Sequence, residues 1–205
     1  SFYMDGVKRS GGYIQEETKA VNGILRNISG KAAEIFQFSG RIAPSDSVFA
    51  LLPSVRSFLE IRDGVYLVGM HTGGLALYDS HTHKLIKYNT REEGSRKLYN
   101  DQVSNIVKDR EGRIWIGTFG GGFCRFDEEK GIMEWLTAVE GLSDDNINSI
   151  IPGDDGKLWI STGNGISAYD PESRQFTNYM GRSEIPVNEF SMKGGIKLPG
   201  DRIYF

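Results

Sequence analysis

The sequence repeats itself with a period of about 44 residues, and this repeat limits the fold more than any other feature. Residues 103–118 and 147–162 share an alternating run, a turn that ends in Gly, and the pattern Ile/Leu-Trp-Ile-Gly/Ser-Thr. Within that pattern, Trp115 and Trp159 lie 44 residues apart. Such spacing is typical of a fold that stacks one small unit several times.

Two weaker copies extend the repeat in both directions. Residues 55–79 form a copy whose turn glycine, Gly64, precedes Gly112 by 48 residues, with the extra length around residues 91–96. A further copy begins near Asn188 and continues to the last residue.

Each copy predicts four short strands. Residues 103–108 alternate with period two, and residues 113–117, 123–126 and 133–136 are β-branched or aromatic runs bounded by Gly or Asp. Four antiparallel strands per repeat of this length are typical of a β-propeller blade, so the predicted fold class is all-β. We expect a single propeller fragment over residues 1–205, with blades at about 1–52 (divergent), 53–98, 99–142, 143–183 and 184–205 (incomplete).

Charge and cysteine content exclude several function classes. The 24 basic and 27 acidic side chains give a net charge of −3, with no basic stripe, which argues against a nucleic-acid partner. No apolar run approaches the length of a membrane span, so we expect no direct membrane contact. With Cys124 as the single cysteine, neither an internal disulfide nor a multi-cysteine zinc site can form.

The run from residue 100 to residue 170 resembles the two-component regulator propeller repeat. It carries the family's Asn-containing turn, Asp-x-x-Gly, Trp-Ile-Gly-Thr, Gly-Gly and Phe/Tyr-Asp pattern, with Ser161 where the second copy departs from Gly. The resemblance implies the periplasmic sensor region of a bacterial hybrid two-component receptor that regulates polysaccharide use and acts as a dimer. Because family rings usually have seven blades, it also implies that these 205 residues are a fragment of a larger receptor.

Antiparallel strand order places the turn before the first strand and the turn between the second and third strands at one end of each blade. Loops at one end of a rigid scaffold are a common place for binding. Amides, carboxylates and an aromatic ring suit a sugar, whose hydroxyls donate and accept hydrogen bonds. The candidate oligosaccharide-binding residues at this end are His71, Asn100, Asp101, Gln102, Phe119, Asp144, Asn146, Asn164 and Glu189.

Structural roles compete with binding at several of these positions. Asn100 and Asn146 are typical turn-capping residues, and both tryptophans of the repeat are expected in the core between blades. Phe119 stands where a small residue is usual in such loops, which makes it the better contact candidate.

Catalytic and metal-binding groups are sparse. His81 and His83 fit a solvated turn better than a zinc site, since no further ligands lie near them in sequence. Cys124 fits a small buried side chain better than a nucleophile. We therefore predict no catalytic residue, no metal and no cofactor.

Two other functions remain open beside the sensor. A metal-dependent lyase or hydrolase, as in propeller enzymes that inactivate streptogramins, would use His71 as its base. A pure interaction scaffold, which only spaces or dimerises the receptor, would bind no small ligand.

Overall fold

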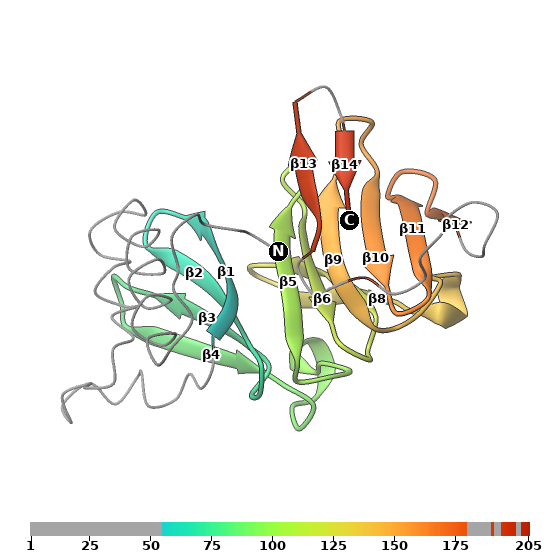
Figure 1. Ribbon diagram of the computed structural model, residues 1–205. Helices are drawn as coiled ribbons and strands as arrows, with labels where there is room; N and C mark the ends of the chain where they lie inside the picture. The colour runs from blue at the N-terminus through green and yellow to red at the C-terminus, as the bar shows by residue number, and fades with distance from the viewer. Residues whose placement is uncertain (1–54, 180–189, 191–193, 200–201) are drawn as a thin grey trace, which may run out of the picture.

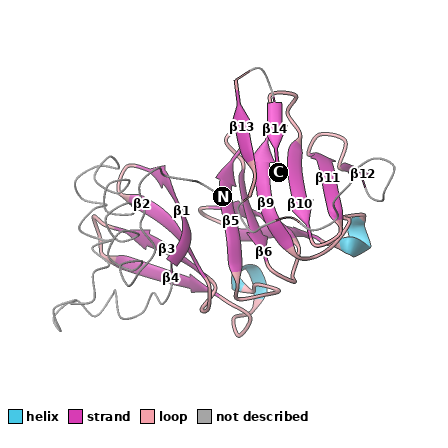
Figure 2. Ribbon diagram, viewed as in Figure 1, coloured by secondary structure: helices cyan, strands magenta, loops and turns pink. Residues whose placement is uncertain are grey.

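The described part of the chain is built almost wholly from β-strands, which confirms the fold-class prediction (Figure 1; Figure 2). The computed structural model describes residues 55–179, 190, 194–199 and 202–205. Three four-stranded antiparallel sheets follow one another along the chain, and a two-stranded hairpin comes last. The blade predicted for residues 1–52 lies outside the described residues. Among those described, no helical segment is long and apolar enough to cross a membrane.

We call the three sheets blades I, II and III; in each, the strands pair in the order in which they occur along the chain. Blade I contains β1 (Val55–Arg62), β2 (Val65–Met70), β3 (Leu75–Asp79) and β4 (Lys84–Tyr88). Blade II contains β5 (Val103–Lys108), β6 (Ile114–Thr118), β7 (Phe123–Asp127) and β8 (Gly131–Leu136). Blade III contains β9 (Ile147–Pro152), β10 (Leu158–Thr162), β11 (Gly165–Asp170) and β12 (Gln175–Tyr179). The hairpin consists of β13 (Ile196–Leu198) and β14 (Arg202–Tyr204).

The aspartate that ends the third strand of each blade explains the Phe/Tyr-Asp part of the repeat. Its Oδ1 accepts hydrogen bonds from backbone N–H groups two and three residues further on, at 2.8 to 3.3 Å. A carboxylate in this position stabilises the tight turn into the fourth strand. The three aspartates are Asp79, Asp127 and Asp170.

Neighbouring blades meet through their first strands, which lie side by side in Figure 1. The N–H of Ile106 in β5 donates to Ser57 Oγ in β1 at 3.0 Å. Asn105 Nδ2 donates to the carbonyl of Asn148 in β9 at 3.1 Å. Because these bonds join successive blades, the sheets stack as in a partial propeller.

Two hydrophobic cores lie between the blades. We call the contact of blades I and II the first seam, and that of blades II and III the second seam. The first seam is mainly aliphatic, with Leu67 and Ile116 fully buried. The second seam is aromatic: the Trp115 ring lies 5.8 Å from Tyr169 and from Phe123, centroid to centroid.

The two tryptophans of the repeat differ in burial. Trp115 is 1% exposed, as expected for a core residue between blades. Trp159 is half-buried and stacks on Tyr179 of its own blade at 5.9 Å. The prediction of a core position between blades is therefore confirmed for Trp115, whereas Trp159 is only partly buried.

A buried carboxylate holds the second seam at the end where β5 meets β6. Asp109 Oδ2 accepts hydrogen bonds from Trp115 Nε1 at 2.9 Å and from Arg113 Nε at 2.6 Å. Arg113 also donates to Glu172 of blade III at 2.6 Å. Burial opposes ionisation of Asp109, but the hydrogen bonds from Trp115 and Arg113 outweigh it and hold the pKa of Asp109 below its usual value.

Candidate functional site

At the end of the propeller opposite Asp109, the turn before the first strand of a blade contacts the turn after its second strand. The N–H of Phe119, after β6, donates to the carbonyl of Gln102, before β5, at 2.9 Å. In the next blade, the N–H of Gly163 donates to the carbonyl of Asn146 at 3.0 Å. The two loop types that sequence reasoning placed at one end are thus directly bonded to each other.

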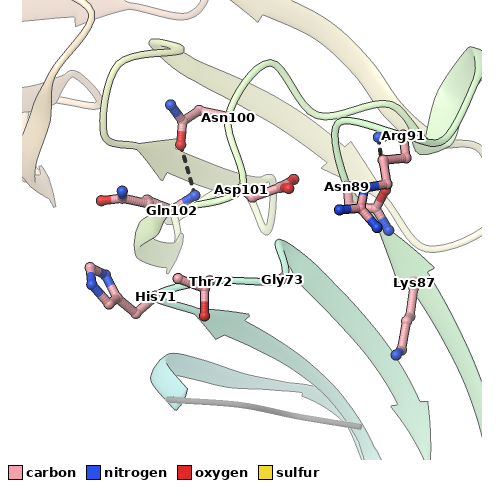
Figure 3. A pocket seen from close by; sticks show the side chains of 9 residues that line it. All are labelled: His71, Thr72, Gly73, Lys87, Asn89, Arg91, Asn100, Asp101 and Gln102. Atoms are coloured by element: carbon pink, nitrogen blue, oxygen red, sulfur yellow. Dashed lines mark hydrogen bonds between the residues drawn. The ribbon is translucent and has the colours of Figure 1, made fainter.

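A pocket of about 470 Å³ opens at this end of the first seam (Figure 3). Four predicted site residues line it, namely His71, Asn100, Asp101 and Gln102. Sequence reasoning placed the loop that contains Thr72 and Gly73 at this end, but missed the other three lining residues, Lys87, Asn89 and Arg91. Figure 3 shows His71 on one side of the pocket, with Lys87 and Arg91 on the other. Pockets of this volume are large enough for a small ligand.

The turn before β5 supplies three of the lining residues and has a defined shape. Asn100 Oδ1 accepts a hydrogen bond from the N–H of Gln102 at 2.8 Å, which is the turn-capping role expected of Asn100. The carboxylate of Asp101 accepts from Thr90 N at 2.7 Å and Thr90 Oγ1 at 3.0 Å. Asp101 therefore ties the connection after β4 to the turn before β5.

The loop after β2 approaches this turn closely and needs a glycine to do so. The N–H of Gly74 donates to the carbonyl of Asp101 at 3.0 Å. Gly74 has φ +80°, and a Cβ there would lie 2.1 Å from the carbonyl oxygen of Tyr88. Only glycine fits such a backbone position, so Gly74 allows the loop after β2 to approach the turn before β5.

The missed residues come from the end of β4 and the connection that follows it. Asn89 Oδ1 accepts from the N–H of Arg91 at 2.9 Å, so a second turn orders this wall. Residues 94–96 form a short 3-10 turn within the same connection. The signal in the sequence was the longer spacing of this copy, which lengthens the connection between blades I and II.

Among the residues that line the pocket, His71 carries a buried polar atom without a partner in the described part of the chain. Its Nδ1 is buried and has no hydrogen-bond partner among the described residues. An unpaired buried polar atom costs folding free energy, which stable proteins usually avoid away from functional sites. The unpaired Nδ1 therefore makes His71 a candidate for contact with a ligand.

The other predicted site residues do not line the pocket. Phe119, Asp144 and Asn146 lie at the corresponding end of the second seam, where Phe119 is 36% exposed. Asp144 Oδ1 accepts from the N–H of Asn146 at 2.7 Å, so Asp144, not Asn146, caps the turn that corresponds to Asn100. The exposed Asn164 lies in the turn after β10, and Glu189 lies outside the described residues.

The remaining histidines and the cysteine lie apart from the pocket. His83 Nδ1 is 3.1 Å from the hydroxyl of Tyr78, and His81 lies 3.4 Å from the carboxylate of Asp63. Cys124 is fully buried, and burial raises the pKa of its thiol, as expected for a structural residue. Over residues 55–179 and the described part of the C-terminal hairpin, no three His, Cys, Asp or Glu side chains are grouped to hold a metal ion.

Solved structures with similar folds include bacterial receptor domains. One is the extracellular domain of a protein assigned to the one component systems of B. thetaiotaomicron, with 22% identity and a TM-score of 0.56 over 73% of this chain. This chain spans 21% of that domain. This likeness supports the propeller fold.

Two further structures are similar over nearly the same part of the chain. The extracellular domain of a protein assigned to the hybrid two component systems of B. thetaiotaomicron has 25% identity and a TM-score of 0.47, over 74% of this chain and 26% of that one. Virginiamycin B lyase from Staphylococcus aureus has 17% identity and a TM-score of 0.49, over 73% of this chain and 54% of the lyase.

No curated protein matches the chain. The family model described as "Two component regulator propeller" matches residues 100–120 and 141–164. These ranges contain the turn before the first strand in blades II and III, and the second of them reaches the end of β10. Residues 100–120 and 141–164 therefore carry two-component regulator propeller repeats, within a chain whose described part folds into propeller-like blades.

Proposed function

We propose that this chain is a ligand-sensing segment in the periplasmic part of a hybrid two-component receptor, and that the pocket at the first seam binds an oligosaccharide. The observation that carries the proposal is the pocket, in which loops of two blades bring polar side chains around one concave space of about 470 Å³. Repeats of the two-component regulator family support the receptor role. The similar extracellular domain from B. thetaiotaomicron supports the propeller fold on which the proposal depends.

The donors and acceptors of the pocket suit sugar hydroxyl groups. Asn89, Asn100 and Gln102 carry carboxamides, each with a carbonyl acceptor and an N–H₂ donor. Asn89 and Asn100 use their Oδ1 atoms within the turns, which fixes the direction of the side chains and presents Nδ2 as a separate donor. A sugar held between such groups needs little rearrangement of the protein, which favours binding.

The receptor role adds two further proposals. Sugar binding is relayed by a change in the arrangement of receptor dimers, and the output regulates the use of the polysaccharide from which the sugar comes. Sedimentation velocity of the chain with and without a bound sugar tests the first point. A shift in the monomer–dimer distribution is expected, and an unchanged distribution contradicts dimer rearrangement by this segment.

Thermal unfolding in the presence of oligosaccharides tests the binding proposal. The panel contains xylotetraose, mannotetraose, galactotetraose, tetragalacturonic acid and a heparin tetrasaccharide, each with and without EDTA. A ligand at 100 times its Kd stabilises the folded state by about 2.7 kcal/mol, which raises Tm by a few degrees. The matched variants are Gln102→Ala, in the pocket, and Asn146→Ala, at the corresponding position of the second seam.

The proposal predicts a Tm rise with one class of sugar that Gln102→Ala reduces and Asn146→Ala preserves. A cooperative melt that no sugar shifts would contradict binding and favour the scaffold. A Tm that falls on addition of EDTA would favour the metal-dependent enzyme and direct attention to His71.

A further inference from the structure

The first and second seams can be compared residue by residue, because the third and fourth strands of blades I and II pair in the same register at this end. Leu75 pairs with Tyr88 in blade I as Phe123 pairs with Leu136 in blade II. Each residue that lines the pocket therefore has a counterpart at the second seam. At three positions a basic side chain of the first seam corresponds to a non-basic aromatic or aliphatic one at the second: His71 to Phe119, Lys87 to Trp135 and Arg91 to Val139.

One hydrogen bond between the connection and the following turn recurs at both seams, although the connection after β4 is longer than that after β8. Asp101 Oδ1 accepts from the N–H of Thr90 at 2.7 Å, and Asp145 Oδ1 accepts from the N–H of Ala138 at 2.7 Å. The side chains therefore differ around a shared hydrogen bond. The second seam forms this bond without cationic groups, so the bond does not explain why the first seam carries them.

Lys87 and Arg91 form no ion pair within the described residues, where Asp101 is the one carboxylate among the side chains that line the pocket. Lys87 Nζ and the Arg91 guanidinium make neither a hydrogen bond nor an ion pair there, and Asp101 is bonded to Thr90. Several other arginines of the described residues are paired with carboxylates, such as Arg62 with Glu128 at 2.7 Å. The pocket thus offers two cations to whatever enters it.

Resting on the function proposed above, we propose that the first-seam pocket selects anionic oligosaccharides and holds a carboxylate or sulfate group with Arg91 and Lys87. The guanidinium of an arginine matches the two oxygens of a carboxylate or sulfate with parallel hydrogen bonds, and the ammonium of a lysine adds a point charge. The carboxamides of the pocket then bind the hydroxyl groups of the same sugar.

Calorimetric titration of the full chain with three matched tetrasaccharides tests this selection. The probes are tetragalacturonic acid, its fully methyl-esterified and therefore neutral form, and a sulfated heparin tetrasaccharide. Arg91→Ala and Lys87→Ala remove the proposed anion contacts. Lys97→Ala is the matched control, since it removes one positive charge from the same connection but outside the pocket.

The proposal predicts binding of at least one acidic probe, weaker binding of the neutral ester, and a loss of affinity as salt is added. Arg91→Ala and Lys87→Ala should each weaken binding about tenfold to a hundredfold, because bonds to charged groups are the stronger kind. Lys97→Ala should leave the affinity within about twofold, as expected for an exposed charge. All three variants should keep the wild-type Tm.

Binding of only the uronate probe identifies the bound group as a carboxylate, and binding of only the heparin probe, which carries sulfates beside its carboxylates, shows that a sulfate is needed. Either result supports the proposal. Equal binding of the acid and its methyl ester, or unchanged affinity in both pocket variants, would overturn anion selection and leave sugar sensing in place. Binding of only the neutral sugars in the thermal panel would have the same meaning. If no probe and no panel sugar binds, both proposals are wrong.

Discussion

At the first seam, the N–H of Gly74 donates to the carbonyl of Asp101 at 3.0 Å; at the second, the N–H of Gly122 donates to the carbonyl of Asp145 at 2.9 Å. The same backbone bond joins both pairs of blades, yet the first seam contains a polar pocket and the second an aromatic core that includes Trp115. The comparison teaches that the repeat specifies how blades are joined, whereas side chains that vary between copies decide what each junction does.

The two seams also differ in how they are stabilised. A buried network at the second seam links Asp109 to Trp115 and, through Arg113, to blade III. At the first seam, the corresponding bridge is the more exposed pair of Arg62 and Glu128. We therefore expect stability to depend more on the second seam and ligand binding to depend on the first.

The largest effect is expected from Trp115→Ala. Removing this buried ring leaves a cavity among aromatic side chains and should lower the free energy of unfolding by about 3–5 kcal/mol, measured by urea denaturation. Trp159→Ala is the matched control and should cost clearly less, because Trp159 is half-buried. Equal losses of unfolding free energy in the two variants would contradict the larger contribution of the second seam to stability.

Asp109→Asn should lower the free energy of unfolding by about 1.5–3 kcal/mol at pH 7, since a charged acceptor of buried donors is lost. The pKa of Asp109 is lower in the folded state than in the unfolded state. The charge of Asp109 thus contributes to the free energy of unfolding above the pKa of the unfolded state, about 3.9. This contribution disappears as pH falls through the pKa of the folded state.

Urea denaturation of wild type and Asp109→Asn at pH 7 and pH 3 measures this dependence. The difference between the two proteins should shrink at the lower pH. Glu111→Gln is the control, because it changes an exposed carboxylate that pairs with the same Arg113. Its unfolding free energy should differ less from that of wild type at both pH values. A difference independent of pH would show that the Asp109 charge does not stabilise the seam.

The shared backbone predicts equal effects of Gly74→Ala and Gly122→Ala. Both glycines have positive φ, +80° and +72°, and a Cβ at either would lie within 2.4 Å of a carbonyl oxygen. Each substitution should cost about 1–3 kcal/mol in chemical denaturation. Gly156→Ala is the control, because Gly156 also has positive φ but no atom lies near the added Cβ. It therefore separates the cost of the backbone conformation from the cost of the steric clash. A large loss at only one seam would mean that the junctions are built differently.

The smallest effect is expected from Glu128→Gln at the first seam. Its side chain is 33% exposed and that of Arg62 is 55% exposed, so solvent screens their attraction. The loss in unfolding free energy should not exceed about 1 kcal/mol and should vanish in high salt. A larger loss that persists in salt would place a major stabilising contact at the first seam.

Much of the fold could be predicted because the repeat carries its own turn chemistry. The spacing of Asp127 and Asp170 and the Trp-containing strands were enough to predict four antiparallel strands per copy. The second-seam network was harder to see, because Asp109 reaches Trp115 across a hairpin whose exact register sequence alone does not determine. In blade III, Gly153 stands where blade II has Asp109, so the repeat itself does not carry this contact.

The pocket was predicted only in part. Asn100, Asp101 and Gln102 belong to a turn that blades II and III share, whereas Lys87 and Arg91 lie where the first copy departs from the second. Sequence reasoning followed what the copies have in common, so it found the shared loops and missed the variable wall. A search for the positions where aligned copies change from apolar to charged would have pointed to Lys87 and Arg91.

The most direct test of the difference between the seams is an amide chemical-shift titration of the ¹⁵N-labelled chain with tetragalacturonic acid. Corresponding amides at the two seams are observed in the same sample, so the shifts at one seam serve as the control for those at the other. The account predicts that Gly73, Gly74 and Asp101 shift in a saturable manner while Gly122 and Asp145 do not. Shifts centred on Gly122 and Asp145, or equal shifts at both seams, would contradict a binding site specific to the first seam.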